Sequence, residues 1–150
     1  MAPVKLFVYD LSKGMARAFS SFTGRQIDGI WHTSVVVHGK EWYFGPGIIN
    51  EIPGQTILGP PLRIIYMGET EVTEEIIHQH IKDMRVNFTP EKYHLLDNNC
   101  NNFSNLFCEF LTGRNIPDYI TNLPADFLST PMGRHFRPML EIMFGPSRHP

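Results

Sequence analysis

Two side chains of this 150-residue sequence have the chemistry of a thiol hydrolase, a cysteine at position 100 and a histidine at position 32. Cys100 lies in the stretch NNCNN, directly before the apolar run FSNLFCEFL, so we predict that it sits in the first turn of a helix. Unpaired backbone N–H groups and the positive end of the helix dipole stabilise a thiolate there. The pattern favours an activated nucleophile, with a cysteine that merely fills space as the alternative.

A thiol nucleophile also needs a base, and imidazole has the proton affinity that suits neutral pH. Of the seven histidines, His32 is set apart because it interrupts GIWHTSVVV, a strand-like segment whose other members are small or apolar. A hydrogen-bonded core histidine is the competing interpretation. His78 and His80 are not spaced i, i+4, and the chain has only two thiols. We therefore predict no metal site and no cofactor.

The second cysteine, Cys108, lies eight residues further along the same predicted helix. At a rise of roughly 1.5 Å per residue, the two cysteines are about 12 Å apart along the axis. A disulfide allows at most ~7 Å between the two Cα atoms, so we expect two free thiols, as in the cytosol or nucleus. Because Cys108 lies between Phe107 and Phe110, we interpret it as a small buried hydrophobe.

Strands and turns that must position these groups are predicted from β-branched and aromatic runs bounded by Gly and Pro. The predicted strands are residues 4–9, 30–38, 41–44 and 62–67. The middle two form a hairpin around a Gly39–Lys40 turn, and the GPG at 45–47 ends it.

Helices are predicted from capping residues and apolar spacing. The predicted helices are residues 12–22, 73–86 and 99–112, capped by Ser12, Thr73 and either Asn98 or Asn99, with two short ones within 122–129 and 130–144. Gly113 supplies the stop of the cysteine helix. A stripe with spacing i, i+3, i+4, i+7, i+8 is predicted to face the core, namely Phe103, Leu106, Phe107, Phe110 and Leu111.

Composition limits the classes of protein. With 42% hydrophobic and 19% charged residues, the chain is typical of a single globular domain. A net charge of −2 with scattered Lys and Arg predicts no nucleic-acid partner. No apolar run approaches the roughly 20 residues of a membrane span, and no signal peptide is recognisable. We expect a soluble intracellular protein with one domain over residues 1–142 and a flexible tail over 143–150.

Seven stretches, in this order, resemble the PPPDE family of cysteine peptidases: YDLSKGMARAF, GIWHTSVVVHGKEWYFG, LGPP, TEVTEEI, NNCNNFSN, FLTGRNIPDYI and STPMG. Within that family they look like the deSUMOylating isopeptidases of the first type, and the similarity runs from about Val4 to about Leu140. The resemblance implies an α+β fold with a small antiparallel sheet packed with helices, similar to a circularly permuted papain-like peptidase. It also implies that His32 and Cys100 form the catalytic dyad.

The implied reaction removes the modifier SUMO from lysines of target proteins. Cys100 attacks the carbonyl of the modifier's terminal glycine, while His32 acts first as base and then as acid. The two rest either as a neutral pair or as an ion pair. The Cys100 backbone N–H is the expected first oxyanion donor, and the sequence identifies no second donor. Glu41 is the only acidic residue on the hairpin's partner strand, and we predict no third catalytic residue.

Residues that flank the dyad are candidates for substrate binding. Trp31, Asn99 and Asn101 are expected to line a narrow channel for a Gly-Gly tail, although Asn99 has a capping role and Trp31 a core position as alternatives. The resemblance implies SUMO-conjugated partners, a homodimer, and a location in cytoplasm and nucleus. Two other functions stay open. They are an S-acyl-protein thioesterase that uses the same dyad, and a non-catalytic adaptor for ubiquitin-like or shuttling proteins.

Overall fold

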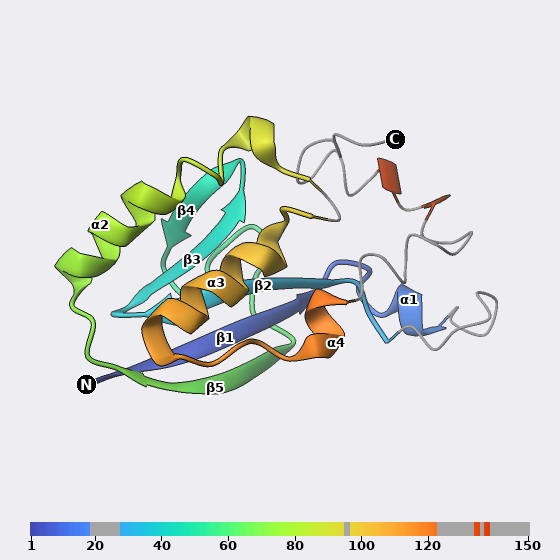
Figure 1. Ribbon diagram of the computed structural model, residues 1–150. Coiled ribbons are helices and arrows are strands. Elements are labelled where there is room, and N and C mark those ends of the chain that lie inside the picture. The colour runs from blue at the N-terminus through green and yellow to red at the C-terminus, as the bar shows by residue number, and fades with distance from the viewer. Residues whose placement is uncertain (19–27, 95–96, 123–133, 136, 139–150) are drawn as a thin grey trace.

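A computed structural model describes residues 1–18, 28–94, 97–122, 134–135 and 137–138. Its centre is one antiparallel sheet of five strands in the order β4-β3-β2-β1-β5, with α3 lying across one face (Figure 1). The strands are β1 Ala2–Asp10, β2 Trp31–Val37, β3 Lys40–Gly45, β4 Gly47–Glu51 and β5 Arg63–Thr70. The helices are α1 Met15–Ala18, α2 Glu74–Met84, α3 Cys100–Thr112, α4 Asp118–Thr121 and the 3₁₀ turn η2 Pro90–Lys92. The predicted α+β class with a small antiparallel sheet is confirmed.

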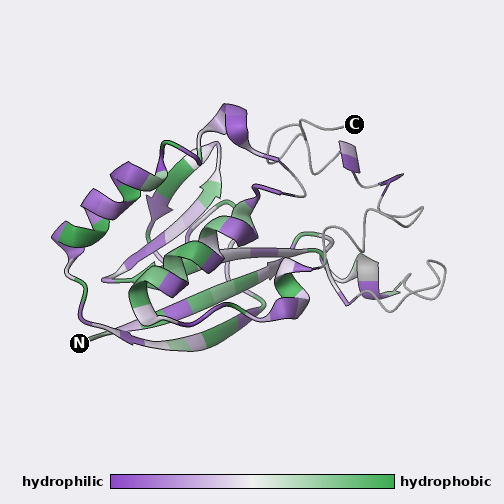
Figure 2. Cartoon of the chain, viewed as in Figure 1, coloured by the Kyte–Doolittle hydropathy of each residue, from purple (hydrophilic) through white to green (hydrophobic). Residues whose placement is uncertain are grey.

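The sheet is built on β1, which pairs with β2 on one side and β5 on the other. Alternate residues of β1 are fully buried, namely Val4, Leu6 and Val8, as the period of a strand with one core face requires. Figure 2 shows hydrophobic residues along β1 and on α3, while α2 carries hydrophilic residues on its outer side. The core therefore lies between the sheet and α3.

The hairpin differs from its prediction both in its turn and in the strand after it. The turn residues are His38 and Gly39, both with positive φ (49° and 71°), so β3 begins at Lys40 and the predicted Gly39–Lys40 turn was one residue too late. Two positive φ values are what a tight two-residue hairpin needs. The GPG segment does not end the sheet, because β4 begins at its last residue, Gly47, and pairs with β3. The sequence analysis missed β4, whose five residues are too few for a clear alternation.

Helix α2 confirms its prediction. Thr73 is the N-cap, and its hydroxyl accepts a hydrogen bond from the backbone N–H of Ile76 at 3.3 Å. The buried residues are Ile77, Ile81 and Met84, which share one face of the helix.

Helix α3 has the predicted bounds but not the predicted core face. Asn99 is its N-cap and Gly113, with φ 75°, its left-handed stop. The predicted burial of Leu106 and Phe110 in this stripe was wrong, since these residues are 48% and 36% exposed. Ser104 is buried instead, and Cys108 is buried as predicted, because the small size of both residues lets the helix pack closely on the sheet. Phe110 turns outward and stacks on His80, with ring centroids 3.6 Å apart.

The segment after β1 also corrects a prediction. Helix α1 begins at Met15, and Ser12 is not its cap. The Asp10 carboxylate accepts hydrogen bonds from the backbone N–H and hydroxyl of Ser12 and from the N–H of Gly14. It also accepts from the N–H of Ile30 at 3.0 Å, which ties the end of β1 to the start of β2. Of the predicted late helices and tail, nearly all positions lie outside the described residues, and α4 was not predicted.

Candidate active site

The start of α3 is attached to the edge of β2. Strand β2 pairs with β3 only from Val35 to Val37, which leaves the edge of its first residues to α3. The Asn101 amide donates to the carbonyl of Trp31 at 2.9 Å and accepts from the hydroxyl of Thr33 at 2.8 Å. The Ser104 hydroxyl donates to the carbonyl of Thr33 at 3.2 Å. The first turns of the helix thus satisfy backbone groups that a sheet edge would otherwise leave unpaired.

This attachment places Cys100. Its side chain is buried, with 3% of the residue exposed, and its thiol donates a hydrogen bond to the side-chain oxygen of Asn101 at 3.8 Å. The backbone N–H of Thr33 and the hydroxyl of Tyr93 also act on the sulfur, and both lower its pKa. The N–H of Thr33 belongs to the peptide group that joins it to His32. The cysteine sulfur therefore lies against the backbone of His32, although 68 residues separate the two in sequence.

Burial outweighs these donors in setting the protonation of the thiol. Desolvation raises the pKa of Cys100 to about 11, while the donors from Thr33, Tyr93 and Asn101 pull it down by less. Burial thus favours the neutral thiol, one of the two resting forms that the sequence left open. A helix terminus stabilises an anion by up to ~2 kcal/mol, too little to offset loss of water around a fully buried sulfur.

His32 is buried as well, with 1% exposed, and its ring lies between two tyrosines. The ring centroids are 5.7 Å from Tyr9 and 5.5 Å from Tyr43, the latter edge to face. Desolvation lowers the pKa of His32 to about 3, so the imidazole is neutral at physiological pH. Both members of the predicted dyad are therefore neutral.

The two tyrosines beside His32 are each held by a carboxylate. The Tyr9 hydroxyl donates to Glu41 at 2.6 Å, and the Tyr43 hydroxyl donates to Glu51 at 2.7 Å. Glu41 is fully buried and also accepts the backbone N–H of Gly54 at 2.9 Å. Burial and the carboxylate raise the pKa of each phenol, so both remain hydroxyl donors. The sequence analysis missed these two tyrosine–carboxylate hydrogen bonds. Glu41 and Tyr43 are two positions apart in a strand and therefore share one face, which was the available signal.

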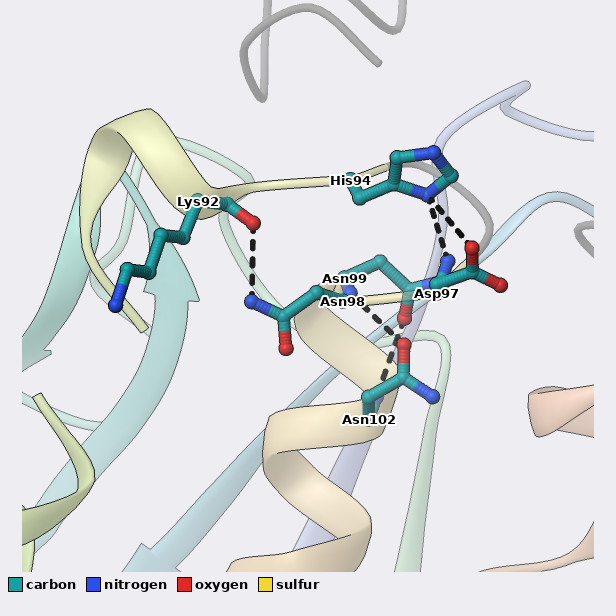
Figure 3. Close-up of polar contacts among 6 residues, drawn as sticks. All are labelled: Lys92, His94, Asp97, Asn98, Asn99 and Asn102. Atoms are coloured by element: carbon teal, nitrogen blue, oxygen red, sulfur yellow. Dashed lines mark hydrogen bonds and ion pairs between the residues drawn. The ribbon is translucent and has the colours of Figure 1, made fainter. Parts of the chain in front are cut away.

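Asn99 has the capping role that the sequence left open. Its side-chain oxygen accepts the backbone N–H groups of Asn101 and Asn102 at 2.9 and 3.1 Å, and the Asn102 side chain accepts the N–H of Asn99 at 2.8 Å. This reciprocal capping box is seen at the top of α3 in Figure 3. It fixes the first turn of the helix, which carries Cys100.

The chain before the cap is also tied down. The Asn98 amide donates to the carbonyl of Lys92 at 3.0 Å and to that of Asn87 at 2.8 Å. His94 Nδ1 accepts the backbone N–H of Asp97 at 2.9 Å and lies 3.5 Å from its carboxylate (Figure 3). These contacts fix both ends of the connection between η2 and α3.

Trp31 is 7% exposed, and the contacts of its ring are with the protein. The ring packs so closely on Gly29 that a Cβ there would lie 2.6 Å away. It meets Tyr119 edge to face at 6.0 Å, and the Arg63 guanidinium lies 5.8 Å from its centre. Trp31, Asn99 and Asn101 thus all have structural contacts, and their role in binding substrate stays a prediction.

Two cavities are lined by other residues of the described chain, and the second reaches Tyr9, which packs on His32. A cavity of about 550 Å³ between α2 and α3 is lined by His80 and Phe110, and one of about 880 Å³ near α1 is lined by Tyr9 and Ile57. Within the described ranges, no cluster of three or more His, Cys, Asp or Glu side chains could hold a metal ion. In the same part of the chain, no helix is long and apolar enough to cross a bilayer.

Comparison with known proteins defines the class. Residues 2–141 match the family described as "PPPDE putative peptidase domain", so the chain belongs to the PPPDE peptidase family and is a hydrolase of the peptidase class. It is 53% identical over 142 residues to desumoylating isopeptidase 1 of Homo sapiens, which covers 93% of this chain and 84% of that protein. Desumoylating isopeptidase 1 of Xenopus laevis is 48% identical over 141 residues, covering 92% and 83%. The Caenorhabditis elegans homolog is 33% identical over 105 residues, covering 63% and 31%. The predicted family is confirmed.

Proposed function

We propose that this protein is a cysteine isopeptidase that releases SUMO from lysines of target proteins, with Cys100 as nucleophile and His32 as base and acid. The observation that carries the proposal is the contact between the Cys100 sulfur and the peptide group after His32. It brings the sulfur to the backbone beside His32, whose imidazole has the chemistry that a thiol hydrolase needs in its base. The substrate is proposed from the similarity to proteins named desumoylating isopeptidase 1.

The protonation states favour one of the two starting forms. Burial raises the pKa of Cys100 and lowers that of His32, so an ion pair at rest is disfavoured. We infer that the thiol proton passes to His32 as the sulfur attacks the glycine carbonyl. The C–S bond forms, and the carbonyl π pair moves to oxygen. His32 then gives the proton to the lysine amine as the C–N bond breaks, and water hydrolyses the thioester.

The orientation of His32 needs no third catalytic residue in this proposal. The rings of Tyr9 and Tyr43 pack on the imidazole, and Glu41 and Glu51 hold those rings. This packing fixes the rotamer of His32 and places uncharged tyrosine rings beside its imidazole. Glu41 acts on His32 through Tyr9, whose hydroxyl it holds.

Three further properties are proposed from the resemblance. The permuted papain-like topology is supported by the chain order, since the strand of His32 precedes the helix of Cys100. A homodimer and a location in cytoplasm and nucleus complete the proposal.

The test is labelling by two probes in parallel. SUMO with a thiol-reactive group at its C-terminus should label wild-type protein at Cys100, as mapped by peptide mass spectrometry. Cys100→Ser should abolish labelling, and Cys108→Ala should leave it intact. Labelling at Cys108, or absence of labelling, would contradict the proposal. Reaction with an acyl-thioester probe alone would favour the S-acyl-protein thioesterase.

A further inference from the structure

An open groove of about 550 Å³ lies between α2 and α3, the two longest helices that the structure describes (Figure 1). Its apolar lining joins buried side chains at the end of α2 and just after it to exposed ones on α3, namely Met84, Phe88, Leu106 and Phe110. Leu106 and Phe110 are 48% and 36% exposed. Because they are four positions apart on a helix, they are neighbours on its surface and form one apolar edge of the groove.

The apolar side chains of the groove are held in place by ring contacts. The Phe110 ring stacks on that of His80, with centroids 3.6 Å and planes 5° apart. Phe88 meets the rings of Phe103 and Phe44 edge to face, at 5.6 and 5.1 Å between centroids, which anchors the bottom of the groove in the core. A partner would therefore meet ordered side chains, and binding to a preorganised surface costs less conformational entropy.

The charged side chains that line the groove are acidic. They are Asp83 on α2 and Glu109 on α3, both exposed, and neither forms an ion pair with another described residue. No Lys or Arg is among the described lining residues. Burial lowers the pKa of His80, so this ring is uncharged at neutral pH. An apolar groove with two unpaired carboxylates is complementary to a polypeptide segment in which Lys or Arg flanks an apolar side chain.

The groove lies on the helix that carries the proposed nucleophile. Leu106 follows Cys100 by six residues, which is about 9 Å along the axis at a rise of roughly 1.5 Å per residue. Asn87, another lining residue, accepts a hydrogen bond at its carbonyl from the Asn98 amide at 2.8 Å, and Asn98 directly precedes the cap of α3. An extended chain spans about 3.3–3.6 Å per residue, so a polypeptide in the groove lies only a few residues from the cysteine.

We propose that the groove between α2 and α3 docks the target protein, through a segment in which Lys or Arg flanks an apolar side chain. The proposal rests on the proposed isopeptidase function, in which the target carries the modified lysine. The apolar side chain lies against Leu106 and Phe110, and the basic side chains pair with Asp83 and Glu109. Docking away from the reacting groups binds ground state and transition state alike. It therefore lowers KM for conjugates whose target has such a segment, and it changes kcat little.

The first test measures binding without catalysis. A short fluorescein-labelled peptide with two leucines one helical turn apart among arginines is titrated with the protein by fluorescence anisotropy, beside the same peptide with glutamate for arginine. Asp83→Lys combined with Glu109→Lys should weaken binding of the arginine peptide by about tenfold or more and make the glutamate peptide the better ligand. Glu69→Lys with Glu71→Lys is the matched control, because it makes the same change of charge at exposed carboxylates outside the groove. It should bind both peptides as wild type does.

The second test measures cleavage of SUMO joined to one lysine within each peptide. Wild-type protein should show a KM about tenfold lower for the arginine conjugate, and Asp83→Lys with Glu109→Lys should reverse this order. Both proteins should cleave SUMO linked to lysine alone at the same rate. Equal KM values, or peptide binding that survives the double variant, would overturn the docking site and leave the proposed function standing.

Other occupants of the groove give different results. If the double variant changes binding of free SUMO, or the oligomeric state in sedimentation velocity, but not binding of the arginine peptide, the groove belongs to the modifier or to a second copy of this chain. Either result would overturn the docking of targets. Wild-type protein that binds the arginine peptide but cleaves no conjugate would overturn the proposed function and leave a groove that binds basic segments.

Discussion

Helix α3 buries two cysteines in very different surroundings, Cys100 in its first turn (the polar end) and Cys108 in its C-terminal half (the apolar end). Cys100 at the start is met by the hydroxyl of Tyr93 and the N–H of Thr33, while Cys108 lies deep in the hydrophobic core. Burial raises both pKa values, to about 11 for Cys100 and about 12 for Cys108, where desolvation acts alone. Burial therefore does not distinguish a nucleophile from a core residue. The distinguishing feature is the set of polar groups aimed at the sulfur.

The largest expected effect comes from exchanging the two sulfurs for other atoms. Cys100→Ser should lower the rate of isopeptide cleavage by at least about 10⁴-fold, because the proposed nucleophile is lost. Cys108→Ala should keep that rate within a few fold, since only packing in the core changes. The rates are measured on a SUMO–lysine conjugate, with circular dichroism to show that both variants are folded. Similar losses of cleavage rate in the two variants would contradict the proposal that only Cys100 takes part in the reaction.

The apolar end can be tested through its aromatic residues. Phe107 is fully buried against Trp42, at 6.4 Å between centroids, whereas Phe110 is 36% exposed and stacks on His80. Phe107→Ala should reduce the free energy of unfolding by about 3–5 kcal/mol. Phe110→Ala should reduce it by only about 0.5–1.5 kcal/mol, the value of an aromatic contact. Urea unfolding measures both, and equal losses would show that the predicted stripe, with Phe110 in the core, was right after all.

Side chains at the polar end of α3 should contribute less to the free energy of unfolding than Phe107 does, and more to the rate of cleavage. Asn101→Ala leaves the carbonyl of Trp31 and the hydroxyl of Thr33 without their partner, which costs about 1–3 kcal/mol. It also loosens the contact between β2 and the first turn of α3, so cleavage should slow. Asn105→Ala is the control, because Asn105 accepts one hydrogen bond, from the N–H of Ile116 at 2.9 Å, away from the site. It should cost about 0.5–1.5 kcal/mol and leave cleavage unchanged. A drop in cleavage with Asn105→Ala alone would contradict this division.

The same contrast explains what could be predicted from sequence. The bounds of α2 and α3 agree with the signals of Thr73, Asn99 and Gly113, because caps act on neighbouring backbone and leave a local signal. Contacts between distant segments leave none. The attachment of Asn101 to β2 and the contact of Tyr93 with Cys100 depend on the packing of the whole chain.

The resting protonation of the pair could not be predicted from sequence for a related reason. The position of Cys100 at a helix start was right, but a sequence does not show how deeply a residue is buried. Burial decides the pKa here, since desolvation is the largest influence on Cys100 and the cause of the shift at His32. The face of α3 was misjudged in the same way, because hydrophobic spacing ranked Phe110 above the smaller Ser104.

The smallest expected effect is a pH dependence that belongs to the polar end alone. In the folded protein the pKa of His32 is lowered to about 3 from an ordinary 6.5, so the unfolded chain binds one more proton between these values. Its contribution to stability is complete above pH 6.5 and is lost as pH falls towards 3, by at most about 1.4 kcal/mol per pH unit. Tyr9 and Tyr43, which face the ring, do not titrate in this range because their pKa values are raised. Urea unfolding between about pH 7 and 5 should therefore show a shallower slope in His32→Gln than in wild type. Phe107→Leu should lower stability equally at every pH, and a His32→Gln slope identical to that of wild type would place the acid sensitivity elsewhere.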